Sequence, residues 1–171
     1  GIMTFIHESN SFAGKANIFL AKRATKIFVA TDGMEKFFPA KKIMVTGNPV
    51  RQSIASNTVS KDVAWAYFGL NAGKKTVLSI GGSLGARTIN ESVEAHMGNW
   101  VQNGFQLLWQ TGKIYYPVIV ERTNNKDLSN IHIKEFIREM DMAYAAADMI
   151  ISRAGALSIS ELCVVGKPCI L

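Results

Sequence analysis

Short apolar runs alternate along this chain with segments in which apolar residues recur at helical spacing. The runs predict strands at residues 1–7, 27–30, 43–46, 76–80, 105–111, 131–134, 149–152 and 168–171. The intervening segments predict helices at residues 13–24, 63–68, 86–102, 116–122, 140–147 and 158–165. Because strands alternate with helices, the pattern indicates an α/β fold with parallel sheets covered on both faces.

A polar stretch at residues 53–62 and a Gly/Lys-rich turn at residues 71–75 flank a short predicted helix. The region 52–75 is therefore the best candidate for a domain boundary. The first predicted strand has no strand before it as a partner, and no helix follows the last one. We expect the chain to be an internal piece of a larger protein.

The chain has 171 residues, of which 48% are hydrophobic and 19% charged, and its net charge is +6. Most of this surplus lies in residues 1–51, which contain eight Lys and Arg but only three Asp and Glu. Such an excess favours an anionic partner such as phosphate, nucleic acid or lipid headgroups, although a solvated helix face carries the same charges. No apolar run reaches the roughly 18–20 residues that span a bilayer, and no signal segment opens the chain, so we expect neither an integral membrane protein nor a secreted one.

The two cysteines, Cys163 and Cys169, lie in an apolar stretch without the spacing of metal ligands. We expect reduced thiols in the core. His, Cys and Asp do not cluster along the chain, which argues against a metal site.

A glycine-rich turn separates the predicted strand 76–80 from the predicted helix that follows. It contains Gly81, Gly82 and Gly85, and its glycines let a ligand approach the backbone closely. The free N–H groups and positive dipole end of the helix suit phosphate. The turn matches neither a P-loop nor G-x-G-x-x-G, and a tight strand–helix turn without a ligand remains the alternative.

Three further segments follow predicted strands. In the segment 153–161, the carboxylate of Glu161 can accept hydrogen bonds from the two hydroxyls of a ribose. Ser158-x-x-Glu161 equally matches a capping box, in which Glu161 binds only the end of its own helix. Arg51 follows the turn signal Gly-Asn-Pro and suits either a diphosphate or a surface ion pair. The polar residues 7–10 stand where α/β sheets bind ligands, although any strand end needs polar residues.

Five motifs together resemble the MurG family of peptidoglycan glycosyltransferases. They are HESNSFAG at 7–14, GNPVR at 47–51, GGSLGA at 81–86, FI at 136–137 and RAGALSISE at 153–161. Their order and spacing match over nearly the whole chain. The family usually has Gln where Ser9 and Leu84 stand, and Ser and Thr where Ala154 and Ser158 stand.

The resemblance implies an α/β fold of the GT-B type, with two Rossmann-like parallel-sheet domains that are both incomplete in this chain. Residues 1–50 would end the acceptor-side N-terminal domain, and residues 51–171 would form most of the UDP-sugar-binding C-terminal domain. The implied activity is inverting transfer of N-acetylglucosamine from UDP-N-acetylglucosamine to lipid I, giving lipid II, without metal or cofactor. The implied partners are these two substrates and an anionic membrane, not nucleic acid, and the implied location is peripheral, on the cytoplasmic face of the bacterial cell membrane.

The resemblance also implies roles for single residues. Ile137 would meet the uracil through its backbone, and Glu161 would meet the ribose. The positions expected to bind UDP-N-acetylglucosamine are Asn10, Arg51, Ser83, Ile137, Ala156, Leu157, Ser158, Ile159, Ser160 and Glu161. The positions expected at the acceptor side or the phosphate loop are His7, Glu8, Gly81, Gly82 and Gly85. No catalytic residue is expected within the chain, because the family's loop with the proposed base precedes Gly1, and the chain alone is expected to be inactive.

Two other classes of function remain open. One is another GT-B UDP-sugar glycosyltransferase or a UDP-sugar epimerase, against which the motifs at 7–10 and 47–51 weigh. The other is a basic nucleotide- or nucleic-acid-binding module, which the lack of interleaved aromatic residues opposes.

Overall fold

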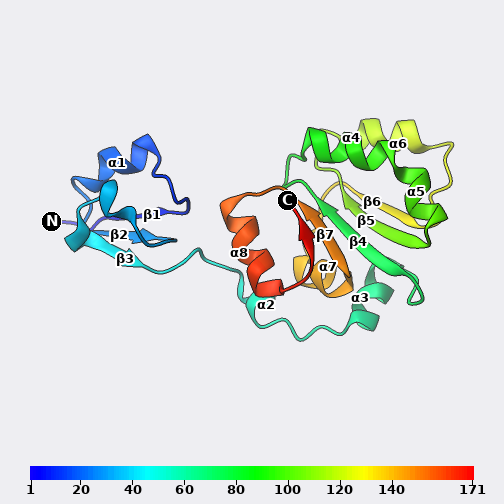
Figure 1. The fold of residues 1–171 in the computed structure, drawn as a ribbon, viewed down its shortest axis with the longest axis horizontal. Coiled ribbons are helices and arrows are strands. Elements are labelled where there is room, and N and C mark those ends of the chain that lie inside the picture. Colours follow the sequence, from blue (N-terminus) through cyan, green and yellow to red (C-terminus); the bar gives the residue numbers. More distant parts are fainter. The chain divides into compact units, whose positions relative to one another are not determined.

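A computed structural model describes residues 1–171, apart from the side chain of Val101. The chain forms two compact units (Figure 1). The first contains Gly1–Val50 with Gly155–Ser160, and the second contains Arg51–Ala154 with Glu161–Leu171.

The first unit is built on a parallel three-stranded sheet in the order β1-β2-β3. Its strands are β1 (Phe5–Glu8), β2 (Lys26–Val29) and β3 (Ile43–Val45). Helix α1 (Lys15–Ala21) connects the first two strands, and the 3₁₀ turns η1 (Met34–Lys36) and η2 (Ala40–Lys42) connect the last two. A parallel pair needs such crossover connections, because a tight hairpin joins only antiparallel strands.

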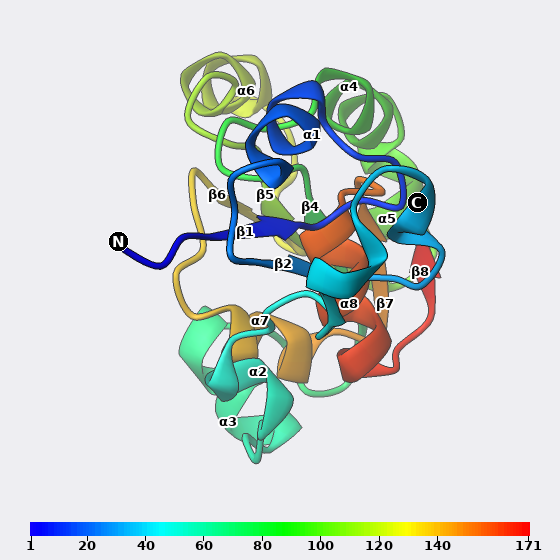
Figure 2. The same cartoon turned by 90° about the vertical axis from the view of Figure 1, so that its left-hand side faces the viewer.

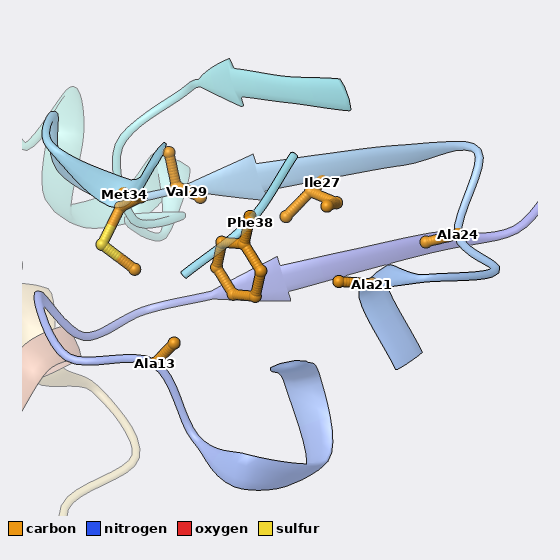
Figure 3. Close-up of a cluster of buried hydrophobic side chains, with 7 residues drawn as sticks. All are labelled: Ala13, Ala21, Ala24, Ile27, Val29, Met34 and Phe38. Atoms are coloured by element: carbon orange, nitrogen blue, oxygen red, sulfur yellow. The ribbon is translucent and has the colours of Figure 1, made fainter. Parts of the chain in front are cut away.

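Figure 3 shows the apolar core of this unit. Ile27 and Val29 extend from β2 and are fully buried against Met34 and Phe38 from the segment that follows. Ala13, Ala21 and Ala24 complete the cluster, and their small side chains let the chain around α1 approach the sheet closely. Burial of each large apolar side chain contributes about 1.5–3 kcal/mol to folding.

The second unit contains a parallel five-stranded sheet in the order β6-β5-β4-β7-β8. Its strands are β4 (Lys75–Ile80), β5 (Phe105–Gln110), β6 (Ile131–Lys134), β7 (Met149–Ser152) and β8 (Cys169–Ile170). The chain moves outward from β4 through β5 to β6 and then crosses back to β7. The strand order therefore reverses at β4, the place where open parallel sheets bind ligands.

Helices cover both faces of this sheet (Figures 1 and 2). On one face α4 (Arg87–Ala95), α5 (Met97–Gln102) and α6 (Tyr116–Thr123) pack on an apolar cluster around the fully buried Trp109. On the other face lie α3 (Lys61–Phe68) and α7 (Met140–Ala146). The short α2 (Gln52–Ala55) follows the first unit, and α8 (Ala156–Val165) contains residues of both units.

The predicted α/β alternation is observed, but several element bounds were wrong. The strand expected at residues 1–7 forms only Phe5–Glu8, because β2 offers it partners only from Lys26 onward. The helix expected at residues 86–102 is two helices, because the backbone of His96 leaves helical geometry at φ −106° and ψ 12°.

The expectation of core thiols was also wrong. Cys163 and Cys169 are both free and exposed. Cys163 lies on the exposed side of α8, and Cys169 lies on β8, which is the edge strand of its sheet. Among the described residues, no helix is long and apolar enough to cross a bilayer.

Candidate functional site

Three loops meet at the carboxyl edge of the five-stranded sheet. They follow β4 (residues 81–86), β5 (residues 111–115) and β6 (residues 135–139). Since all strands are parallel and β5 lies between the other two, these loops are neighbours. The N–H of Lys113 donates to Ser83 O at 3.2 Å, and the N–H of Gly112 donates to Glu135 O at 3.1 Å. The middle loop is therefore hydrogen-bonded to both of the others.

The glycine-rich loop after β4 comes into direct backbone contact with the loop after β5. Gly85 has φ +88°, and a Cβ on it would lie 2.1 Å from the carbonyl oxygen of Thr111. Gly112 has φ +83°, and a Cβ on it would lie 2.1 Å from the nitrogen of Gly85. Only glycine fits these two positions. A side chain would overlap with backbone atoms of the other loop, and the positive φ angle disfavours every residue that carries a Cβ.

Helix α4 begins directly after this loop. Ala86 is its N-cap and provides no side-chain hydrogen bond to the first turn. The uncapped N–H groups and the positive end of the helix dipole are suited to an anion. The sequence prediction of a phosphate-binding turn thus has the required local geometry, while the binding itself stays a prediction.

Gln110, the last residue of β5, joins the loops after β4 and β6. Its side chain is buried, its Nε2 donates to Gly82 O at 3.1 Å, and its Oε1 accepts from Ile137 N at 2.8 Å. Both ends of the amide are used. The backbone N–H of Ile137 is consequently engaged within the protein, and its carbonyl is the backbone group left to meet a ligand.

Arg51 and Glu161 form an ion pair in the second unit. Arg51 Nε lies 3.2 Å from Glu161 Oε1, and its Nη2 lies 3.4 Å from Oε2. The hydroxyl of Tyr144 donates to the same carboxylate at 3.1 Å. Burial raises the pKa of Tyr144 well above its ordinary value, and the charge of Glu161 raises it further, so the hydroxyl keeps its proton.

The capping-box interpretation of Glu161 was wrong. Helix α8 begins at Ala156, so Ser158 lies inside its first turn rather than at the N-cap. The carboxylate of Glu161 instead faces Arg51 and Tyr144.

Glu8 organises the loop after β1 in the first unit. Its carboxylate is buried and accepts hydrogen bonds from Asn10 N and Nδ2, Gly14 N and Asn17 Nδ2, at 2.8–3.1 Å. Burial alone would raise the pKa of Glu8, but the hydrogen bonds from Gly14, Asn17 and Asn10 together lower it below its ordinary value. Glu8 is therefore ionised near neutral pH and holds the side chain of Asn10.

His7 ties the end of β1 to the turn after β3. Its Nε2 lies 3.2 Å from Gly47 O and its Nδ1 lies 3.3 Å from the hydroxyl of Ser9. The carbonyl requires a donor, so Nε2 carries the proton and Nδ1 accepts from Ser9. Asn48 Nδ2 adds a bond to Ser9 O at 3.2 Å. Gly47 and Asn48 thus meet His7 and Ser9 at one end of the three-stranded sheet.

The predicted site residues fall into both units. The second unit brings Ser83, Gly81, Gly82 and Gly85 together with Ile137 at the sheet edge, and pairs Arg51 with Glu161. The first unit contains His7, Glu8, Asn10 and the first residues of α8, Ala156, Leu157, Ser158, Ile159 and Ser160. The ligand role of each residue stays a prediction.

Sequence reasoning missed three residues with structural roles at these places: Gln110, Gly112 and Tyr144. A signal existed for Gln110, which is a polar residue that ends an apolar strand directly before Thr-Gly. Tyr144 gave no signal, because its apolar neighbours in α7 made it look like an ordinary core residue. Among the described residues, no group of three His, Cys, Asp or Glu is placed to hold a metal ion.

Residues 76–171 match the model of the glycosyltransferase family 28 C-terminal domain. The chain belongs to glycosyltransferase family 28. This membership does not favour the nucleic-acid-binding alternative, and it places the glycine-rich loop, Gln110 and Glu161 within a family domain.

Comparisons with individual proteins agree with family 28. The chain is 50% identical over 171 residues to a UDP-N-acetylglucosamine–N-acetylmuramyl-(pentapeptide) pyrophosphoryl-undecaprenol N-acetylglucosamine transferase of Parabacteroides distasonis, covering all of this chain and 46% of that protein. The crystal structure of Acinetobacter baumannii MurG is 27% identical, with a TM-score of 0.59 over 97% of this chain and 44% of that one. The chain thus spans about half the length of these relatives.

A second solved structure shares the fold alone. The UDP-GlcNAc 2-epimerase of Neisseria meningitidis bound to UDP-GlcNAc has a TM-score of 0.62 at 17% identity, over 88% of this chain and 45% of that one. The similarity to the Acinetobacter baumannii structure and the two parallel sheets confirm the predicted α/β fold of the GT-B type.

Proposed function

We propose that the whole protein to which this chain belongs transfers N-acetylglucosamine from UDP-N-acetylglucosamine to lipid I and so forms lipid II. The observation that carries the proposal is the 50% identity, over all 171 residues, to a transferase named for this reaction. The motifs at 81–86 and 153–161 lie in the matched family domain. The epimerase shares only the fold, so it is not the favoured alternative.

The diphosphate of the donor would bind at the start of α4. The glycine-rich loop brings backbone close to this position, and the uncapped helix terminus provides N–H donors. Positive potential here stabilises the diphosphate in the bound donor and the added charge on the UDP leaving group.

The nucleoside would contact Ile137 and Glu161. Because Gln110 takes up the N–H of Ile137, the Ile137 carbonyl is the group available to accept from the N3–H of uracil. The Glu161 carboxylate would accept hydrogen bonds from the ribose hydroxyls. Arg51, which is half exposed, would turn from Glu161 toward a phosphate oxygen.

The first unit would form the acceptor side and contact the membrane. Phe19 on α1 is 71% exposed and lies one helical turn from Lys15, and the exposed Lys22 and Arg23 directly follow the helix. An exposed apolar side chain beside basic ones suits an anionic lipid surface. We place the whole protein on the cytoplasmic face of the membrane, where it would meet lipid I peripherally.

We assign no catalytic residue within this chain, and the resemblance implies a reaction without metal or cofactor. Calorimetry on the whole protein tests the donor assignment. UDP-N-acetylglucosamine should bind, while a CDP-sugar and a single-stranded oligonucleotide of similar charge should not. Equal or tighter binding of the oligonucleotide would contradict the proposal.

A further inference from the structure

Gln110 is a buried amide with both ends committed to loops at the ligand edge of the sheet. Its relative exposure is 4%. One end donates to the carbonyl of Gly82, in the turn before α4, and the other accepts from the N–H of Ile137, in the loop after β6. Buried amide groups need such partners, so rotation of this side chain would leave two backbone groups unsatisfied.

The place of Gln110 in the sheet explains why it reaches both loops. Strand β5 lies between β4 and β6, and Gln110 pairs in register with Ile80 on one side and Lys134 on the other. The next residues of β4 lead to Gly82, and those of β6 lead to Ile137. A side chain at the carboxyl end of β5, between these two strands, therefore sets the separation of the loops after β4 and β6.

We propose that Gln110 is a positioning residue for the nucleoside diphosphate. It fixes the phosphate-side turn at Gly82 relative to the base-side loop at Ile137, and it turns the Ile137 peptide so that the carbonyl faces the base. This inference rests on the proposed function, since it assigns the two loops to the two ends of one nucleotide. Binding is weakened when two groups that hold one ligand at separate points are displaced from their correct separation.

The same strand offers a matched control. Gln106 is also a buried glutamine of β5, with 1% exposure, and its amide bonds to Asn71, Lys74 and Thr76. It stands at the amino end of the strand, on the edge opposite the loops. Loss of its amide removes buried hydrogen bonds as well, but it leaves the ligand edge intact.

The experiment measures the dissociation constant for UDP and the melting temperature of the whole protein, in the wild type, Gln110→Met and Gln106→Met. We expect Gln110→Met to weaken UDP binding about tenfold or more, which corresponds to about 1.4 kcal/mol. Both substitutions should lower the melting temperature, and Gln106→Met should bind UDP as the wild type does.

A second variant, Gln110→Glu, keeps the shape of the side chain. As a carboxylate it accepts from Ile137 but cannot donate to Gly82, whereas the protonated acid does both. Its UDP affinity relative to the wild type should therefore be low at neutral pH and recover as the pH falls. This variant still tests the inference if Gln110→Met fails to fold.

The results distinguish failure of the role proposed for Gln110 from failure of the proposed function. If the wild type binds UDP and both Gln110 variants bind it equally well at neutral pH, Gln110 is structural only and the inference is overturned. The same holds if Gln106→Met loses as much affinity as Gln110→Met. If the wild type itself does not bind UDP, the proposed function fails, and the inference fails with it.

Discussion

Arg51 and Glu161, two residues expected to contact the donor, contact each other. Their side chains meet at 3.2 Å, and Glu161 is further held by Tyr144, whose hydroxyl lies 3.1 Å from the carboxylate. The side chain of Arg51 is 53% exposed, whereas that of Glu161 is only 16% exposed. A ribose that binds Glu161 would either share the carboxylate with Arg51 or displace Arg51 from it.

The Glu161→Gln variant should weaken binding of UDP-N-acetylglucosamine. The substitution removes a charged acceptor, and charge-assisted hydrogen bonds contribute about 1.5–3 kcal/mol. The expected loss of affinity is roughly 10- to 150-fold, measured by calorimetry on the whole protein.

Glu94→Gln is the matched control for this test. Glu94 pairs with Arg122 at 3.4 Å and is 19% exposed, so the two glutamates resemble each other in burial and partner. Its substitution should leave nucleotide affinity unchanged. A Glu161→Gln variant that binds the donor normally would contradict the assignment of Glu161 to the ribose.

Glu8→Gln should loosen the loop after β1 and change its response to acid. The folded pKa of Glu8 lies below its ordinary 4.5, so the stability that the ionised form supplies is complete above pH 4.5 and is lost as the pH falls through the folded pKa. At neutral pH, the variant loses charge-assisted hydrogen bonds, which contribute about 1.5–3 kcal/mol. Both effects are measured by the protection factors of the β1 and α1 amides from pH 7 to 3, that is, by hydrogen-exchange rates divided into the intrinsic rate at each pH.

Between pH 4.5 and 3 the protection factors of the wild type should fall more than those of Glu8→Gln. Glu35, an exposed acid on η1, provides the control, since Glu35→Gln should follow the wild-type curve. Parallel pH curves for the wild type and Glu8→Gln would mean that the Glu8 network adds no acid-dependent stability.

Gly112→Ala should destabilise the second unit. The methyl group would lie 2.1 Å from a backbone nitrogen at a residue with φ +83°, so strain and overlap add to about 2 kcal/mol or more. Gly98→Ala, inside α5 with open space around it, should instead be neutral or stabilise by up to about 1 kcal/mol. Equal melting temperatures for the two variants would show that the loop contact is not rigid.

The substitution Phe19→Ser should reduce flotation of the whole protein with anionic liposomes. It removes an exposed apolar side chain next to basic residues that each add about 1 kcal/mol near anionic lipid. Val63→Ser, which removes an exposed apolar side chain from α3 in the second unit, should have no effect. Equal flotation of the wild type with neutral and anionic liposomes at low salt would contradict a contribution of the basic residues to membrane binding.

The α/β alternation was readable from the sequence because buried parallel strands such as residues 76–80 are continuous apolar runs. Element ends were less readable. The break at His96 depends on backbone geometry that no apolar spacing signals, and the bounds of β1 depend on where its partner strand begins. Local patterns carry no information about such partners.

The site was predictable in part for a similar reason. A glycine-rich turn after a buried strand indicates the carboxyl edge of a parallel sheet, so the place of Gly81, Gly82 and Gly85 at that edge was predictable from local sequence. The contacts Arg51–Glu161 and Gln110–Ile137 join residues 110 and 27 positions apart, and only the fold reveals them. The capping box failed because the same four residues fit two structures, and the start of α8 decides between them.

Glycosyl transfer by the whole protein is the decisive assay for the proposed reaction. Purified protein is incubated with UDP-N-acetylglucosamine and a lipid I analogue, and the products are identified by mass spectrometry, with the 171-residue chain assayed in parallel. We expect the whole protein to form lipid II and UDP, and the 171-residue chain alone to transfer no sugar. Consumption of UDP-N-acetylglucosamine without the acceptor, yielding an epimerised sugar and no lipid II, would contradict it.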